Sequence, residues 1–341
     1  IYFFYFYEAK YHFYDDIVYY SVTRDKFLDY SIFYYFSNIG QVKSTIGTNH
    51  IGFWTLVYLS LKIFGLYYYS IILSNIIISI LASYVLYLSL EKMNFQDSFC
   101  KLFFIFSVLH WDMIAWTSFI SSKEPLMFLA ITILFHNLIV INQEKKISIA
   151  NIFFIILSLL IISELRTYIF IFCILIVSGY LMFLIELPKK RFVRALIFVL
   201  PITVLPTYIY LNFSSIYLTI SSAFTLLYPN IANLNEIPIY FLKTLLSPFP
   251  LNIQENYNFL FLPSILHFLT MILLPIGVFL SFNNKHKAFS CYIILFLSTV
   301  TFYSFFPDLA GPRQRFQYSM ILMYWQFLPL YKLFSIKGIY K

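Results

Sequence analysis

The chain has 341 residues, of which 61% are hydrophobic and only 11% carry a charge. A soluble domain carries about 25% charged residues, so this composition excludes a water-soluble enzyme and indicates an all-α, polytopic membrane protein. The net charge of +8 is read as the excess of Lys and Arg that orients membrane helices, and not as an affinity for nucleic acid.

Apolar runs separated by short charged breaks recur along the chain, which predicts one transmembrane domain over residues 1–341. Residues 1–7 are too short to cross about 30 Å of hydrocarbon, so we expect a first helix truncated at its N-terminus. Residues 8–65 are more polar and rich in aromatic clusters, which favours juxtamembrane helices in the membrane interface. Residues 50–65 of this region are too few for a typical span, so we interpret them as an interfacial or re-entrant helix. About ten spans are predicted: the truncated first, then residues 66–90, 99–109, 126–141, 149–162, 168–185, 195–211, 263–282, 289–306 and 318–334.

Basic clusters assign these spans to two faces of the membrane. The strongest lie at residues 189–194, at 285–287 and in the C-terminal tail, and we expect them in the cytoplasm. Parity then places the first polar region and the long loop 212–262 on the outer face, together with 110–124, 163–167 and 307–315. That face holds most of the unusual polar residues: Asp15, Asp16, His50, Lys123, Glu124, Arg166, Asp308, Arg313 and Arg315.

The adjacent carboxylates of Asp15 and Asp16 are the first candidate for chemistry. They repel each other, so one keeps a proton or both share a cation, and either state suits a base that deprotonates a hydroxyl. The alternative is a solvated acidic turn just outside a membrane helix.

Two arginines form the second candidate. Arg313 and Arg315 follow a Gly-Pro turn at the mouth of a helix, and the planar guanidinium fork matches phosphate oxygens. The alternative is simple contact with lipid headgroups.

Two further charged pairs interrupt apolar segments. Lys123 and Glu124 open a helix, and Glu164 and Arg166 lie in an apolar hairpin. Neighbouring opposite charges more often balance each other than catalyse a reaction. The chain has no Gly-rich phosphate loop, no zinc-binding cysteine pair and no HExxH or GxSxG motif.

In this order, these segments resemble the GT-C superfamily of integral-membrane glycosyltransferases. Residues 14–20 look like the family's acidic signature in the first outer loop, and 49–65, ending in Phe64-Gly65, look like its juxtamembrane segment. Segments 122–125, 165–168 and 311–316 are similar to segments of surface-polysaccharide transferases. Asn49-His50 departs from the Pro-rich start of the juxtamembrane segment, and we expect no soluble C-terminal domain, unlike in the larger family members.

The resemblance implies roles for individual residues. Asp15 or Asp16 is expected to be the general base, or the pair to bind a divalent cation such as Mg or Mn. The lipid phosphate is expected to bind to Arg313, Arg315, Arg166 and Lys123. Candidate substrate contacts are His50, Glu124 and Tyr14.

The resulting hypothesis is a glycosyltransferase of the bacterial cytoplasmic membrane with its active face outward. It moves a sugar from a polyprenyl-(di)phosphate carrier to a glycan or lipid acceptor in envelope polysaccharide synthesis. One alternative is a polymerase of O-antigen or capsule repeat units. A second is a transporter or flippase of lipid-linked sugars, for which charges in broken helices at mid-membrane are typical.

Overall fold

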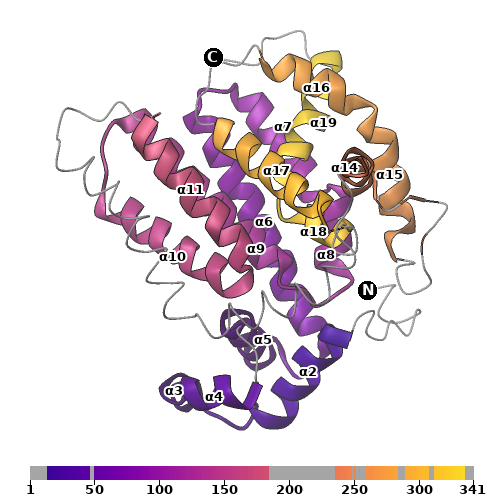
Figure 1. Cartoon of the computed structure of the whole chain (residues 1–341). Helices are drawn as coiled ribbons and strands as arrows, with labels where there is room; N and C mark the ends of the chain where they lie inside the picture. Colours follow the sequence, from indigo (N-terminus) through magenta and orange to yellow (C-terminus); the bar gives the residue numbers. More distant parts are fainter. Residues whose placement is uncertain are drawn as a thin grey trace.

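The computed structural model describes residues 14–46, 50–183, 235–247, 249–250, 253, 259–282, 289–306 and 311–334, and the elements that these residues form are α-helices (Figure 1). The all-α prediction is confirmed for this part of the chain. Among these residues, two helices are long and apolar enough to cross a membrane, or four if each of two bent pairs counts as one span.

The predicted count of about ten spans is not reproduced by the described helices. Several apolar helices have only 10–17 residues, and at 1.5 Å per residue even the longest of them reaches only about 26 Å. The predicted span 195–211 lies outside the described residues. These shorter helices are α5 (Ile51–Phe64), α10 (Ile149–Leu165), α11 (Thr167–Phe183), α14 (Ile237–Leu246) and α17 (Phe289–Ser304).

The two long helices, α6 (Tyr68–Lys92) and α9 (Glu124–Glu144), run parallel in the centre of the bundle. At one end, the Asn75 amide donates to the Ser122 carbonyl over 3.2 Å, and at the other Lys92 pairs with Glu144 over 2.9 Å. Small side chains let two helices approach closely in an apolar medium. The buried small and polar residues of α6 are Ser70, Ser74, Asn75, Ser79, Ala82, Ser83 and Ser89.

Two bent helix pairs complete the bundle together with α19 (Ser319–Phe334). The pair α7 (Asp97–Val108) and α8 (Trp111–Ser118) bends by 43°, at the His110 break expected from the sequence. The predicted span 263–282 is bent: it consists of α15 (Phe261–Met271) and α16 (Leu273–Phe282), which differ in direction by 53°. Pro275 explains this break, because its ring clashes with the carbonyl four residues earlier, at Met271.

Four N-terminal helices form a cap beyond one end of the bundle (Figure 1). The cap is α2 (Tyr14–Lys26), α3 (Ile32–Ser37), α4 (Ile39–Ile46) and α5, which is followed by its C-cap residue Gly65 with a φ of 99°. Tyr20 of α2 contacts Tyr68 at the start of α6, whereas Phe27 packs on Tyr35 of α3. Since α2 therefore runs away from the bundle, its first turn, with Asp15 and Asp16, is the end nearer the bundle.

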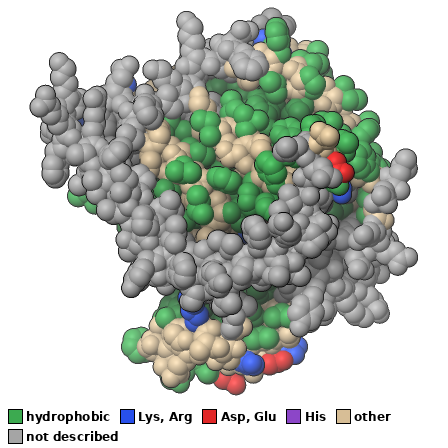
Figure 2. All heavy atoms as spheres, viewed as in Figure 1, with side chains coloured by type: hydrophobic (Ala, Val, Ile, Leu, Met, Phe, Trp, Pro, Cys, Tyr) green, Lys and Arg blue, Asp and Glu red, His purple; other side chains and the backbone are tan. Residues whose placement is uncertain are grey.

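The surface of the bundle and the surface of the cap also differ in their side chains. In Figure 2, hydrophobic side chains make up much of the described face of the bundle, with a small charged patch at its right edge, and charged side chains of both signs lie along the cap. An apolar bundle surface fits a lipid environment, and the charged cap fits contact with water and headgroups. The described helices are therefore compatible with an α-helical membrane protein.

Candidate functional site

A buried carboxylate, Glu124, lies where the cap meets the bundle. Its Oε1 accepts hydrogen bonds from Arg166 Nη2 over 3.0 Å and from Arg313 Nε over 2.8 Å. Arg166 connects α10 to α11, and Arg313 belongs to the short helix α18 (Pro312–Phe316). Segments far apart in sequence thus meet at one point, which we call the Glu124 node: Lys123, Glu124, Arg166 and Arg313.

Local sequence explains why these side chains lie at helix ends. Pro125 occupies the first turn of α9, where its missing N–H costs nothing. Glu124 lies in the same turn, where a carboxylate is favoured by the helix dipole. Arg166 has an extended backbone between two helices, and Gly311 and Pro312 begin α18.

His50 joins the cap to the node. Its Nδ1 lies 2.8 Å from the Glu164 carbonyl oxygen, and its Nε2 lies 2.6 Å from Lys123 Nζ. Because a carbonyl only accepts, Nδ1 carries the proton and Nε2 accepts from the lysine. Burial, and then the Lys123 charge, lower the pKa of His50 to about 4. His50 is therefore a neutral acceptor for Lys123 near pH 7.

Pairing within the node is incomplete. Both arginines use the same oxygen of Glu124, while Glu124 Oε2 and Arg166 Nε are buried with no hydrogen-bond partner among the described residues. The Glu124 side chain is 0% exposed, whereas those of Arg166 and Arg313 are 22% and 19% exposed. The arginines thus lie between the carboxylate and the outside.

A second, complete ion pair lies close by in α8. Arg315 Nη2 donates to Asp112 Oδ1 over 2.7 Å and Arg315 Nε donates to Oδ2 over 3.3 Å. Arg315 Nη1 donates to the carbonyls of Leu245 and Ser247, at the C-terminus of α14, where carbonyls lack a partner within the helix. Arg315 is 1% exposed. In this geometry it holds α14 against α8, and does not face the same group as Arg313.

Hydroxyl and amide groups extend inward from Arg166. Tyr168 and Tyr303 pair through their hydroxyls, and the Tyr303 hydroxyl donates to Gln317 Oε1 over 3.4 Å. Deeper in the bundle, Gln326 Oε1 lies 3.0 Å from His110 Nε2, and its amide donates to Thr270 over 3.3 Å. Gln326 thus links the breaks of both bent helix pairs.

Sequence reasoning did not single out several of these residues. Asp112 and Gln326 each interrupt an apolar stretch, and that interruption was the available signal. Gln317 lies at the end of the polar segment before the last apolar run. Tyr303 had no such signal, and neither had His267, whose Nε2 lies 2.7 Å from the Leu245 carbonyl oxygen beside Arg315, because a lone His or Tyr in an apolar helix is common.

The outcomes for the predicted residues differ. The structure brings His50, Lys123, Glu124, Arg166 and Arg313 together, and it places Arg315 with Asp112 instead. Tyr14, Asp15 and Asp16 lie in the first turn of α2, but their side chains are outside the described part of the chain, as is Asp308. Among the residues searched, no group of three or more His, Cys, Asp or Glu is placed to hold a metal ion.

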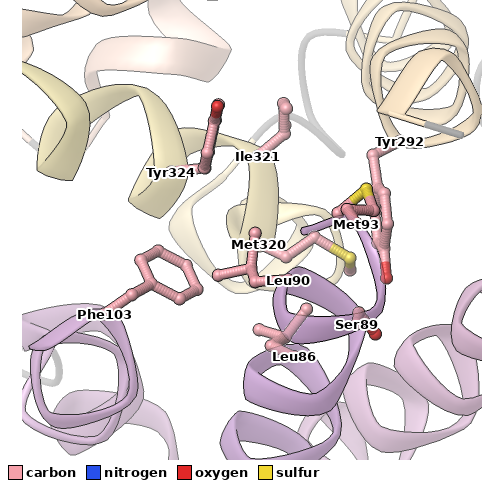
Figure 3. A pocket seen from close by; sticks show the side chains of 9 residues that line it. All are labelled: Leu86, Ser89, Leu90, Met93, Phe103, Tyr292, Met320, Ile321 and Tyr324. Atoms are coloured by element: carbon pink, nitrogen blue, oxygen red, sulfur yellow. The ribbon is translucent and has the colours of Figure 1, made fainter. Parts of the chain in front are cut away.

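A separate cavity lies at the other end of α6, near the Lys92–Glu144 pair (Figure 3). It is lined by side chains of α6, α7, α17 and α19, among them Leu86, Ser89 and Tyr324. Among the described residues, no charged side chain contributes to this lining, so the cavity offers no positive charge to an anionic substrate. The Glu124 node is the better candidate site.

In comparisons with protein-family models, curated proteins and solved structures, nothing matched this chain.

Proposed function

We propose that the chain is a membrane-embedded, GT-C-like glycosyltransferase of about ten spans in the bacterial cytoplasmic membrane, with its active face outward. It moves a sugar from a polyprenyl-(di)phosphate carrier to a glycan or lipid acceptor in the synthesis of envelope polysaccharide. The observation that carries the proposal is the meeting of three cationic side chains, Lys123, Arg166 and Arg313, around Glu124 at one end of an apolar bundle.

The geometry suits a lipid-linked phosphate. The apolar surface of the bundle accommodates a polyprenyl tail, while the cations at its end attract the phosphate. The sequence predicts that the segments around His50, Glu124, Arg166 and Arg313 lie on one face of the membrane. In the structure these segments meet at one end of the bundle, because Glu124 contacts Arg166 and Arg313 and His50 contacts Glu164.

The proposed reaction is a displacement at the anomeric carbon of the donor sugar. A bond forms from the acceptor oxygen to that carbon as the bond to the phosphate oxygen breaks, and the electron pair leaves with the phosphate. Arg166, Arg313 and Lys123 stabilise this developing charge. Asp15 or Asp16, at the end of α2 nearer the bundle, takes the proton of the acceptor hydroxyl.

The test is a transfer assay in membranes that contain the full chain, with a panel of radiolabelled polyprenyl-phosphate sugars. We expect Asp15→Asn or Asp16→Asn to lower transfer by about a hundredfold or more, as for removal of a general base. Lys92→Gln, at the opposite end of the bundle, is the matched control and should leave transfer unchanged. Full activity in both Asn variants would refute the assigned base.

A polymerase of lipid-linked repeat units is the second candidate, because two arginines converge on one carboxylate at the node. In a host whose surface glycan depends on this chain, Arg313→Lys then collapses the glycan ladder to a single repeat. A uniform small shift of the glycan supports transfer of one sugar.

The bent helix pairs favour a third candidate, a transporter of lipid-linked sugars. Asp112 and Arg315 form a buried ion pair beside the α7–α8 break, and ionisable groups at broken helices are typical of transporters. Flipping of a fluorescent polyprenyl lipid in proteoliposomes, without any sugar transfer, would favour this candidate over the transferase.

A further inference from the structure

The pairing of Glu124 differs from that of an ion pair built only for stability. One of its oxygens serves both arginines, and the other has no hydrogen-bond partner in the described structure. Arg166 Nε is also buried without a partner there. An unsatisfied buried polar atom is costly, and the two atoms lack opposite partners. Arg166 Nε–H lacks an acceptor, which indicates a ligand with acceptor oxygens, whereas Glu124 Oε2 lacks a donor, so its negative charge stays uncompensated on that side.

A phosphate group is the ligand that this arrangement fits. It offers several acceptor oxygens to planar guanidinium groups, where Glu124 offers both arginines a single oxygen. Access is from the arginine side, since Arg166 and Arg313 retain exposure and Glu124 has none. Glu124 therefore remains beneath the arginines as a competing negative charge while the phosphate approaches from outside.

We propose that Arg166 and Arg313 form a phosphate-binding site whose affinity is set, and kept low, by the buried carboxylate of Glu124. The inference rests on the proposed function for its ligand class, a phosphate-bearing lipid. Glu124 holds the guanidinium groups in place but repels the incoming phosphate, which favours release of the phosphate carrier after transfer. The opposite role, in which Glu124 only positions the arginines, predicts weaker binding when its charge is removed.

The sign of the effect separates the two roles. In Glu124→Gln the amide oxygen still accepts from the arginines, but the negative charge is gone. We expect Glu124→Gln to bind farnesyl phosphate at least about tenfold more tightly than the original chain, because a like charge a few ångströms from the phosphate is removed. Glu144→Gln is the matched control: its carboxylate pairs with Lys92 at the other end of the bundle, so its affinity should not change.

Binding is measured as the ligand-dependent shift in melting temperature of the purified full chain in detergent. Farnesol is the neutral control for the tail. Inorganic phosphate tests whether the phosphate alone is recognised, and phosphatidic acid tests whether a phosphate on a different lipid is recognised. An equal shift in melting temperature with farnesyl phosphate and with phosphatidic acid supports the phosphate site and means that it binds lipid phosphates in general. Equal or weaker binding by Glu124→Gln overturns the proposal.

Loss of a buried charge partner also destabilises Glu124→Gln without ligand. If the variant does not melt cooperatively alone, the proposal requires farnesyl phosphate, but not farnesol, to restore its transition; failure to do so overturns the proposal.

The two proposals fail separately. Sugar transfer by the original chain, with no gain in affinity in Glu124→Gln, leaves the transferase standing and refutes the role of Glu124. If Glu124→Gln binds farnesyl phosphate more tightly but the original chain transfers no sugar, the phosphate site is supported and the transferase function is refuted.

Discussion

Two buried carboxylates near one end of the bundle hold arginines in contrasting ways. Asp112 gives both oxygens to Arg315, whose other described side-chain hydrogen bonds go to backbone carbonyls at the end of α14. Glu124 gives one oxygen to two arginines that stay partly exposed. The comparison separates Arg315, whose hydrogen bonds hold α14 against α8, from Arg166, whose buried Nε has no hydrogen-bond partner in the described structure and which we propose to bind a ligand.

Breaking the saturated pair should have the largest effect. Asp112→Ala leaves the Arg315 guanidinium buried without its carboxylate, at a cost of about 3–5 kcal/mol. We expect the folded, monodisperse fraction in detergent to fall sharply. The double variant Asp112→Leu with Arg315→Met should recover only part of it, because the Leu245 and Ser247 carbonyls lose their donor. A melting temperature unchanged in Asp112→Ala would contradict the structural role of this pair.

Replacing each arginine by lysine sharpens the comparison. Arg166→Lys and Arg313→Lys keep the charge but lose the planar fork, so binding of farnesyl phosphate should weaken by about ten- to a hundredfold. Arg315→Lys should lower the melting temperature and leave binding by the remaining folded protein nearly unchanged. The reverse pattern would assign the ligand to Arg315.

The difference between Arg313 and Arg315 explains a limit of sequence reasoning. A Gly-Pro turn suggested two guanidinium groups side by side on one phosphate. The residues instead form the helix α18, and side chains two positions apart on a helix point in nearly opposite directions. The carboxylates that receive them are 189 and 203 residues away in sequence, and no local pattern predicts such pairings.

Other features were predictable because their causes are local. Hydropathy predicts α6 and α9, and the polar break at His110 predicts the bend between α7 and α8. The positions of the basic loops predict that His50, Glu124, Arg166 and Arg313 lie at one end of the bundle. Successive spans alternate in direction, so knowing which loops are basic is enough to assign the others to the opposite face. The α15–α16 break was missed because Pro275 lies inside a continuous apolar run, where hydropathy alone does not change.

His50 tests the link between the cap and the Glu124 node through pH. Its pKa is lowered to about 4 in the folded chain, from about 6.5 in the unfolded chain. Below about pH 6.5 the unfolded state binds a proton that the folded state refuses, so stability falls as the pH falls towards 4. The loss at pH 5 is about 1–2 kcal/mol. His50→Gln does not titrate, so the decrease in its melting temperature between pH 7.5 and pH 5 should be smaller; an equal decrease would exclude His50 as the cause.

The smallest effect is expected at the far end of the bundle. Lys92 and Glu144 are 2.9 Å apart, as close as the pairs at Glu124, but both side chains are nearly half exposed. Water solvates both charges when the pair is broken, so Lys92→Gln should cost at most about 1 kcal/mol and leave phosphate binding unchanged. A double-mutant cycle with Glu144→Gln measures this coupling directly. A coupling as large as that between Glu124 and Arg313 would mean that burial does not distinguish these sites, because the interatomic distances, 2.9 Å and 2.8 Å, are nearly equal.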